Sequence, residues 1–169
     1  NPHFLYNTLN SINWMIRAKK NGEAARMTVA LGTILRAALS REQYFTMEEE
    51  LHMLEQYITI QEYRYQKRAV FSIDAKVGGQ YLIPHMTLQP LVENALNHGL
   101  RNVRGEKQVV IRAKVQEENL VIAVEDNGVG LENAEELNQK MMENNLDLVE
   151  RGNSIGLINI NARVKMLYG

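Results

Sequence analysis

The sequence contains no cysteine, and its charges of opposite sign nearly cancel. Without cysteine the chain has neither disulfides nor thiolate metal sites, and a cytosolic setting is expected. The 19 Lys and Arg residues balance 20 Asp and Glu residues, for a formal net charge of −1. So small a net charge provides no overall attraction to nucleic acid or to an anionic membrane, so we expect no nucleic-acid partner.

A long apolar run and a secretory signal peptide are also lacking. The most apolar stretch, residues 27–35, is interrupted by two threonines and a glycine and is too short to span a bilayer. The first residue is asparagine rather than methionine, which is typical of an excised fragment. We therefore expect a cytoplasmic domain, with any membrane anchor in an upstream region outside this sequence.

What is present is a soluble, globular composition. Of the 169 residues, 45% are hydrophobic and 23% are charged, which suits one ordinary domain or two small ones. The first two-fifths of the chain have helical spacing, and the remainder alternates between strand and helix patterns.

Residues 1–45 have the pattern of a helical hairpin. Apolar residues recur three and four positions apart between 3 and 19 and between 23 and 40, and Lys19-Lys20-Asn21-Gly22 is a natural break. One hairpin buries few apolar side chains, so two hairpins are expected to pair into a four-helix bundle, which predicts a homodimer. The apolar positions are Phe4, Leu5, Leu9, Ile12, Ile16, Met27, Leu31, Ile34, Leu35 and Leu39.

Residues 46–169 have the pattern of an α/β sandwich. Thr46 and Glu49 form a capping-box signal before an entry helix expected over 46–67. In the sandwich, 68–169, strands are expected near 70–75, 109–115 and 120–125, and helices at 84–100 and 156–167. A loop at about 139–155, rich in Asn, Met and Glu, is expected to be mobile. The predicted fold class is therefore α+β: a dimeric helical hairpin followed by a two-layer sandwich.

Three short segments carry the candidate chemistry. They are Leu91–Gly99, Asp126-Asn127-Gly128-Val129-Gly130, and Gly152-Asn153-Ser154-Ile155-Gly156-Leu157. An aspartate at a strand end can accept a hydrogen bond from the amino group of a base, and glycines after it admit a close ring. An asparagine on a facing helix offers a neutral oxygen to Mg²⁺, and glycine-flanked backbone N–H groups suit phosphates. Taken singly each segment is also compatible with an ordinary turn or a surface amide.

Together the three segments resemble the Bergerat ATP-binding fold of histidine kinases, gyrase-type and mismatch-repair ATPases, and heat-shock chaperones. The resemblance implies ATP and Mg²⁺ as cofactors, with the loop at 139–155 as an ATP lid. It implies that Asn94 holds the metal ion. The ATP-binding residues that it implies are Glu93, Asn94, Asn97, His98, Asp126, Gly128, Gly130, Gly152, Gly156 and Leu157.

Three positions depart from the pattern or leave a choice open. Hydrolytic members of this fold carry a glutamate four residues before the asparagine that corresponds to Asn94. Pro90 stands at that position, so poor ATP hydrolysis is expected. Asn97 replaces a frequent lysine, and Arg151 in the lid could supply that phosphate contact. His98 either contacts a phosphate or caps its helix before Gly99.

The beginning of the chain supplies a phosphoryl acceptor. Asn1-Pro2-His3-Phe4-Leu5-Tyr6-Asn7 resembles the phosphoacceptor box of LytS-type sensor histidine kinases, which include the YesM-like sensors, and the resemblance covers nearly the whole chain. It implies that His3 takes the γ-phosphoryl group from ATP and passes it to an aspartate on the receiver domain of a response regulator. Imidazole suits this role, because it is nucleophilic at pH 7 and its phosphoramidate is labile.

Asn7 is a second candidate catalytic residue. It lies one helical turn after His3 and therefore on the same face. It could orient a water molecule, hydrogen-bond the imidazole, or be an ordinary surface amide. Two rival functions also stay open, namely a hydrolysing ATPase of the same fold and a nucleotide-gated interaction module without turnover.

Overall fold

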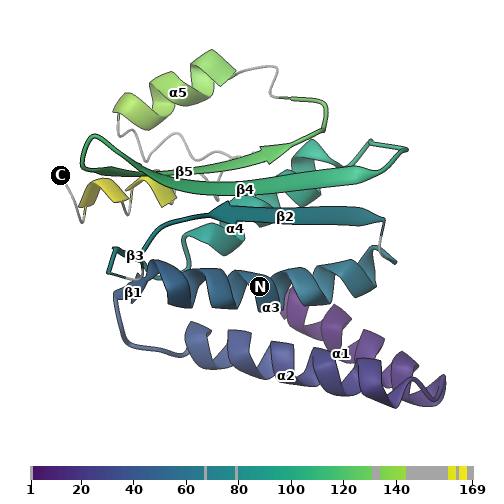
Figure 1. The fold of residues 1–169 in the computed structure, drawn as a ribbon. Helices are drawn as coiled ribbons and strands as arrows, with labels where there is room; N and C mark the ends of the chain where they lie inside the picture. Colours follow the sequence, from purple (N-terminus) through teal and green to yellow (C-terminus); the bar gives the residue numbers. More distant parts are fainter. Residues whose placement is uncertain are drawn as a thin grey trace.

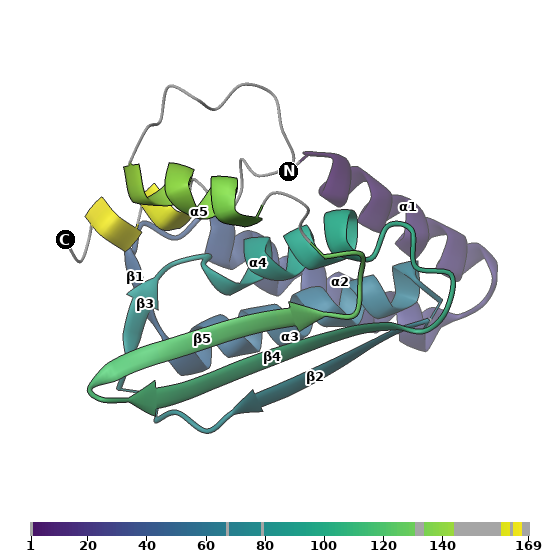
Figure 2. The same ribbon diagram turned by 90° about the horizontal axis from the view of Figure 1, so that it is seen from above.

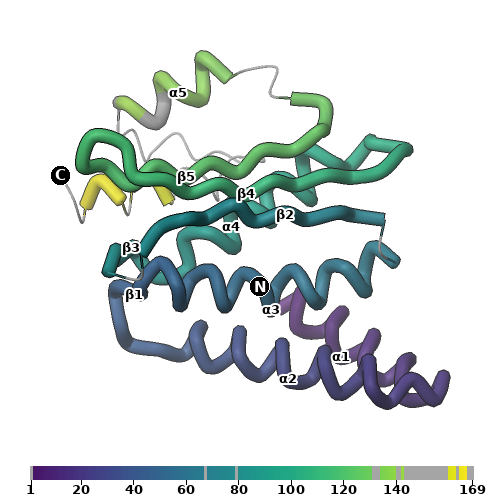
Figure 3. Tube along the Cα trace, viewed as in Figure 1, coloured from purple at the N-terminus to yellow at the C-terminus, as the bar shows by residue number. Residues whose placement is uncertain are grey.

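A long helix, α3 (Met47–Arg64), lies between a helical hairpin and a mixed sheet (Figure 1). The computed structural model describes residues 2–66, 68–78, 80–130, 134–143, 160–162 and 164–166. The hairpin consists of α1 (Pro2–Arg17) and α2 (Asn21–Ala38), as the apolar spacing predicts. Figure 3 traces the chain from this hairpin into α3 and on into the sheet. The α+β fold class is therefore confirmed.

The apolar stripe of the hairpin is only partly buried. Ile12, Met27, Leu31 and Ile34 belong to the core, because α3 packs against α2 within the same chain. The other half of the stripe remains at the surface of the chain. Its members Leu39, Ile16, Leu9 and Leu35 are between 81% and 39% exposed, and so are the neighbouring apolar residues Val29, Tyr6 and Trp14. A single hairpin thus finds a partner in α3, which the hairpin pattern alone did not predict.

The main sheet has the strand order β2-β4-β5. Strand β2 (Ala69–Ala75) pairs in parallel with β4 (Lys107–Gln116), which pairs antiparallel with β5 (Asn119–Asp126). Along β4, the side chains of Val109, Ile111 and Ala113 lie on the buried face of the sheet, and charged side chains lie on its open face. The sheet and the helices against its buried face therefore form two layers. The expected strands are confirmed.

Two further strands were not predicted. Strands β1 (Tyr44–Thr46) and β3 (Leu82–Pro84) form a small antiparallel ladder. Because Pro84 belongs to β3, the helix predicted from residue 84 begins later, as α4 (Leu88–Asn94), and continues as a π-helical turn, η1 (Ala95–Gly99). Figure 2 shows α4 beside the sheet, with α3 behind it.

The region after β5 differs from the predicted loop. Helix α5 (Ala134–Glu143) includes residues 139–143, which the composition assigned to a mobile loop. Residues 144–159 lie outside the described part of the chain, and with them the rest of the predicted lid. Residues 160–162 and 164–166 are helical, in agreement with the predicted final helix. Within the described residues, none of the helices has the length and apolar character needed to cross a bilayer.

The capping box at the start of α3 provides a test of local stability. Thr46 Oγ1 accepts from the Glu49 N–H (3.2 Å), and Glu49 Oε2 accepts from the Thr46 N–H (2.8 Å). Thr46→Ala removes the first bond, so we expect the free energy of unfolding in urea to fall by about 1 kcal/mol. Thr59→Ala, on the exposed side of the same helix, should change it far less. Equal losses for the two variants would contradict the role of the cap.

Candidate functional site

The helix that leads into the candidate site, α4, is capped by a side chain from α3. Glu50 is 2% exposed, and its carboxylate accepts hydrogen bonds from the backbone N–H groups of Met86 (2.5 Å), Thr87 (3.0 Å) and Leu88 (3.2 Å). Thr87 precedes α4, but its hydroxyl donates to the Pro84 carbonyl instead of capping the helix. Burial raises the pKa of the Glu50 carboxyl, and the three backbone donors offset part of this rise.

At its other end α4 widens into a π-turn. Glu93 and Asn94 are half-buried in the last turn of α4, and η1 follows immediately. The Leu100 N–H donates to the Ala95 carbonyl at 2.8 Å, which is the five-residue bond of a π-helix. Such turns occur often at functional sites in helices. Here the π-turn contains Asn97, which is exposed, and His98, which is half-buried.

The end of the π-turn meets the glycine turn after β5. The Val129 N–H donates to the Gly99 carbonyl at 3.2 Å, and the Gly128 N–H donates to Asp126 Oδ1 at 2.9 Å. A Cβ atom on Gly99 would lie 2.4 Å from Asp126 Oδ1, and one on Gly128 would lie 2.1 Å from the Gly99 carbonyl oxygen. At Gly128 the obstacle is backbone, so this position requires glycine, whereas at Gly99 the Asp126 side chain would have to move. This close approach brings two of the three sequence segments together.

Asn127 anchors the glycine turn to the neighbouring strand. Its Oδ1 accepts from the Gln108 N–H (2.9 Å), its Nδ2 donates to the Glu106 carbonyl (3.0 Å), and its N–H donates to the Gln108 carbonyl (3.3 Å). These bonds leave Asp126 exposed at the strand end. Gly130 follows with a φ of +74°, in the left-handed region that favours glycine.

The candidate phosphoacceptor lies in the first turn of α1. His3 is exposed, and the Asn7 Nδ2 atom lies 3.1 Å from its Nδ1 and 3.4 Å from its Nε2. The next residue, Phe4, packs on Tyr57 of α3 with ring centroids 5.5 Å apart. Burial raises the pKa of Tyr57, and the negative charge of Glu93 raises it further. Tyr57 of α3 thus lies between α1 and the end of α4.

The structure leaves part of the predicted site undescribed and adds other residues to it. Gly152, Gly156, Leu157 and Arg151 lie outside the described residues. Sequence reasoning missed the contributions of four residues, which are Glu50, Tyr57, Gly99 and Asn127. For Gly99 a signal existed, because this glycine closes the same segment as Asn94, but it was interpreted only as a helix end.

The oxygen atoms that the described side chains offer suit an Mg²⁺ ion that is held mainly by phosphates. Among the described residues, no group of three or more His, Cys, Asp and Glu side chains is arranged to hold a metal ion. Mg²⁺ commonly takes only one or two protein oxygens and completes its octahedron with phosphates and water. The side-chain amide of Asn94, at the end of α4, has an oxygen of the type that Mg²⁺ binds.

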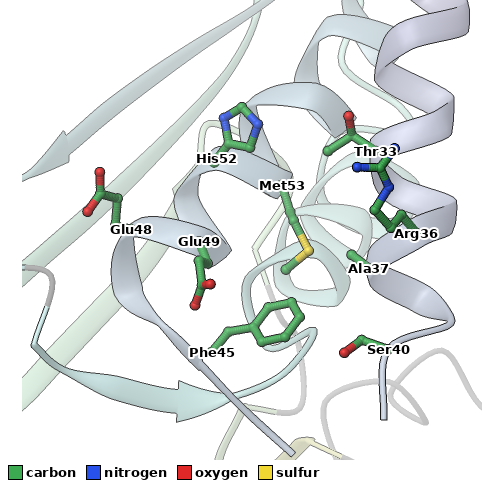
Figure 4. Close-up of a pocket in the computed structure, with 9 residues that line it drawn as sticks. All are labelled: Thr33, Arg36, Ala37, Ser40, Phe45, Glu48, Glu49, His52 and Met53. Atoms are coloured by element: carbon green, nitrogen blue, oxygen red, sulfur yellow. The ribbon is translucent and has the colours of Figure 1, made fainter. Parts of the chain in front are cut away.

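A separate hollow of about 600 Å³ lies between α2 and α3 (Figure 4). Arg36 and Ala37 line it from α2, and His52 and Met53 line it from α3. None of the predicted site residues lines this hollow, so it is distinct from the candidate site.

Two family models match the chain. The model described as histidine kinase matches residues 1–69. The model described as histidine kinase-, DNA gyrase B-, and HSP90-like ATPase matches residues 80–169, which is more than half of the chain.

Relatives with similarity over the whole chain are sensor proteins. The sensor histidine kinase YesM of Bacillus subtilis (strain 168) is 36% identical over all of this chain and 28% of its own length. The sensor histidine kinase YpdA of Escherichia coli (strain K12) is 35% identical, with 29% of its length covered. The sensor protein LytS of Staphylococcus saprophyticus is 31% identical, with 28% covered. The chain therefore spans less than a third of the length of these relatives.

The contact between Gly99 and Gly128 predicts a strong effect of one methyl group. Gly128→Ala places a Cβ atom against the Gly99 carbonyl, so we expect ATP affinity to fall by roughly tenfold or more. Gly105→Ala is the matched control, since a Cβ atom there meets nothing within 4 Å. Calorimetric titration with an ATP analogue measures both variants, and an unchanged affinity in Gly128→Ala would refute this role of the contact.

Proposed function

The chain belongs to the histidine kinases with an ATPase domain of the DNA gyrase B and HSP90 type, and from this premise we propose that His3 is its phosphoacceptor. The γ-phosphoryl group of ATP passes to His3 and then to an aspartate on the receiver domain of a response regulator. The observation that carries the proposal is the joint presence of an exposed His3 and of the Gly99, Asp126 and Gly128 contact in one chain.

The nucleotide is proposed to bind between α4 and the turn after β5. Asp126 is exposed at the strand end, where its free carboxylate oxygen can accept from the amino group of adenine. Gly128 and Gly130 have no side chains, so they leave space for the adenine ring beside Asp126. Glu93, Asn97 and His98 face the nucleotide from α4 and η1, and Gly152, Gly156 and Leu157 complete the phosphate cradle.

Asn94 is proposed as the protein ligand of Mg²⁺. When bound, this ion neutralises charge on the phosphates and lowers the barrier for transfer. Asn94 supplies one neutral oxygen, so the site attracts the ion mainly together with the nucleotide.

The transfer step is a substitution at the γ-phosphorus atom. A lone pair on an imidazole nitrogen of His3 forms the N–P bond, the bond from phosphorus to the β,γ-bridging oxygen breaks, and ADP leaves with that electron pair. Once phosphorylated, the ring loses its N–H proton to solvent. In the second step the ring takes a proton back from solvent, a carboxylate oxygen of the response regulator forms a bond to phosphorus, and the N–P bond breaks so that His3 leaves as a neutral imidazole.

Asn7 is proposed to determine which ring nitrogen of His3 carries the lone pair that can attack phosphorus. A neutral imidazole has one donor and one acceptor nitrogen, and Asn7 Nδ2 faces the ring edge at 3.1 Å from Nδ1. In this arrangement the amide donates to a lone pair and occupies it. A half-turn of the amide would present Oδ1 to an Nδ1–H group and leave Nε2 free to attack, so Asn7 is proposed to orient the ring.

Hydrolysis of ATP to free phosphate is disfavoured by Pro90. This residue lies half-buried in α4, one turn before Asn94, and its side chain has no proton acceptor. We therefore expect the γ-phosphoryl group to be kept for His3. Steady phosphate release without an acid-labile phosphoprotein would favour a hydrolysing ATPase instead.

The chain is proposed to act as a homodimer through its hairpin. We keep the division into a dimerisation and phosphotransfer hairpin, 1–45, and an ATP-binding domain, 46–169. The exposed apolar half of the stripe on α1 and α2 suits a second copy, since a four-helix bundle would bury it. In the full-length protein we propose anchorage in the plasma membrane outside this region, in keeping with the name of its sensor relatives.

Replacement of His3 tests the proposed phosphoacceptor. In the full-length protein with γ-labelled ATP, we expect wild type to acquire an acid-labile label and His3→Gln to lose it essentially completely, since glutamine offers no nucleophilic nitrogen. His52→Gln, an exposed histidine on α3, is the matched control and should label like wild type. Persistence of the label in His3→Gln would refute His3 as the acceptor.

A charge in the exposed stripe tests the dimer. Leu39 is 81% exposed, and Leu39→Glu should place a charge inside the proposed four-helix interface and raise the dimer dissociation constant by about tenfold or more. Sedimentation velocity over a range of concentrations measures the change. Val115→Glu, at the far end of β4, is the control, and equal dissociation in both variants would argue against this interface.

A further inference from the structure

The start of α4 is held across a gap of 36 to 38 residues in sequence. Glu50 Oε1 accepts from the Met86 N–H, and Oε2 accepts from the N–H groups of both Thr87 and Leu88. The N-cap residue itself contributes no side-chain bond to the helix. The first turn of a helix has N–H groups without internal partners, so Glu50 does here what a cap within the helix usually does.

Attachments at its two ends set the position of α4, because the helix is short. It contains seven residues, and an isolated helix of that length is not stable by itself. One end is bound to Glu50. Beyond the other end, the Gly99 carbonyl accepts from Val129 in the glycine turn. Glu93 and Asn94 lie between these two attachments, so their position depends on both.

Helix α3 also borders the far end of α4. Tyr57 lies seven residues after Glu50, about 10 Å along α3 at the usual helical rise, while Thr87 and Glu93 are about 9 Å apart along α4. Glu50 accepts a hydrogen bond from the Thr87 N–H at the start of α4. Tyr57 is close enough to Glu93, near the other end of α4, for the charge of Glu93 to raise its pKa. The two helices thus run alongside each other in the same direction.

We propose that Glu50 is a positioning residue for the nucleotide site, which fixes the start of α4 and thereby the place of Glu93 and Asn94. The proposal rests on the proposed function in taking Asn94 as part of that site. Glu50 itself touches no substrate in this scheme. It acts through the backbone of residues 86–88, and through α3 it connects the nucleotide site to the hairpin that carries His3.

Glutamine at position 50 weakens this attachment with little change in volume. The carboxylate uses both oxygens as acceptors, whereas an amide has one acceptor oxygen and one donor nitrogen. One backbone N–H group at the start of α4 must then face another donor. The binding-competent position of α4 becomes less populated, and the apparent dissociation constant rises in inverse proportion to its population.

The test compares Glu50→Gln with Glu55→Gln in the full chain. Glu55 is an exposed glutamate on the same helix, so its variant controls for the loss of one charge. With a fluorescent ATP analogue we expect the dissociation constant of Glu50→Gln to rise about tenfold, as a lost buried hydrogen bond implies. The KM for ATP should rise equally in labelling of His3, with kcat unchanged at saturating ATP.

A merely structural role would give a different result. It would lower the unfolding midpoint of Glu50→Gln and leave the dissociation constant and KM of the folded protein unchanged, which would overturn the proposal. A lower kcat with an unchanged KM would overturn it too. If wild type binds the analogue but never labels His3, the proposed function fails, while the comparison of dissociation constants still tests Glu50.

A measurement on wild type keeps the proposal testable if Glu50→Gln does not fold. By thermodynamic reciprocity, a contact that favours nucleotide binding must itself be favoured by bound nucleotide. We therefore expect the amide hydrogens of residues 86–88 to exchange several-fold more slowly with saturating ATP analogue. The amide of Glu118, in the hairpin turn between β4 and β5, should exchange equally in both states. Unchanged exchange at 86–88 would overturn the proposal.

Discussion

The candidate site depends on the approach of the Gly99 carbonyl to the glycine turn after β5. This contact joins a helix end to a strand end, and it leaves no room for a Cβ atom at Gly128. Asn127 holds the turn from the other side by bonds to β4. The bonds of Asn127 leave the Asp126 carboxylate exposed at the end of the strand.

Helix α3 is shared by the two functional halves of the chain. One side of it receives α2 and the Phe4 ring, and the other receives α4 and β2. Its buried polar residues are therefore not only a matter of stability. Tyr57 of α3 contacts the hairpin through Phe4, and Glu50 of α3 accepts a hydrogen bond from the backbone just before α4.

Local patterns in the sequence predicted the features that arise from neighbours in the chain. Thr46 and Glu49 are three residues apart, and Asp126 and Gly128 are two apart, so their chemistry is visible as a motif. The contact of Glu50 with residues 86–88 joins distant segments and leaves no periodic trace. Strands β1 and β3 are three residues each, which is too short to display alternation, and so Pro84 was placed in a helix.

The π-turn after Asn94 has a consequence for how this segment tolerates length changes. A wide turn holds one residue more than an α-helical turn in about the same revolution around the axis. Deleting a single residue between 95 and 98 would therefore restore regular winding without breaking the helix. The Gly99 carbonyl would keep nearly its present direction toward Val129, so the extra residue changes the side chains that this turn presents rather than the point at which the chain leaves it.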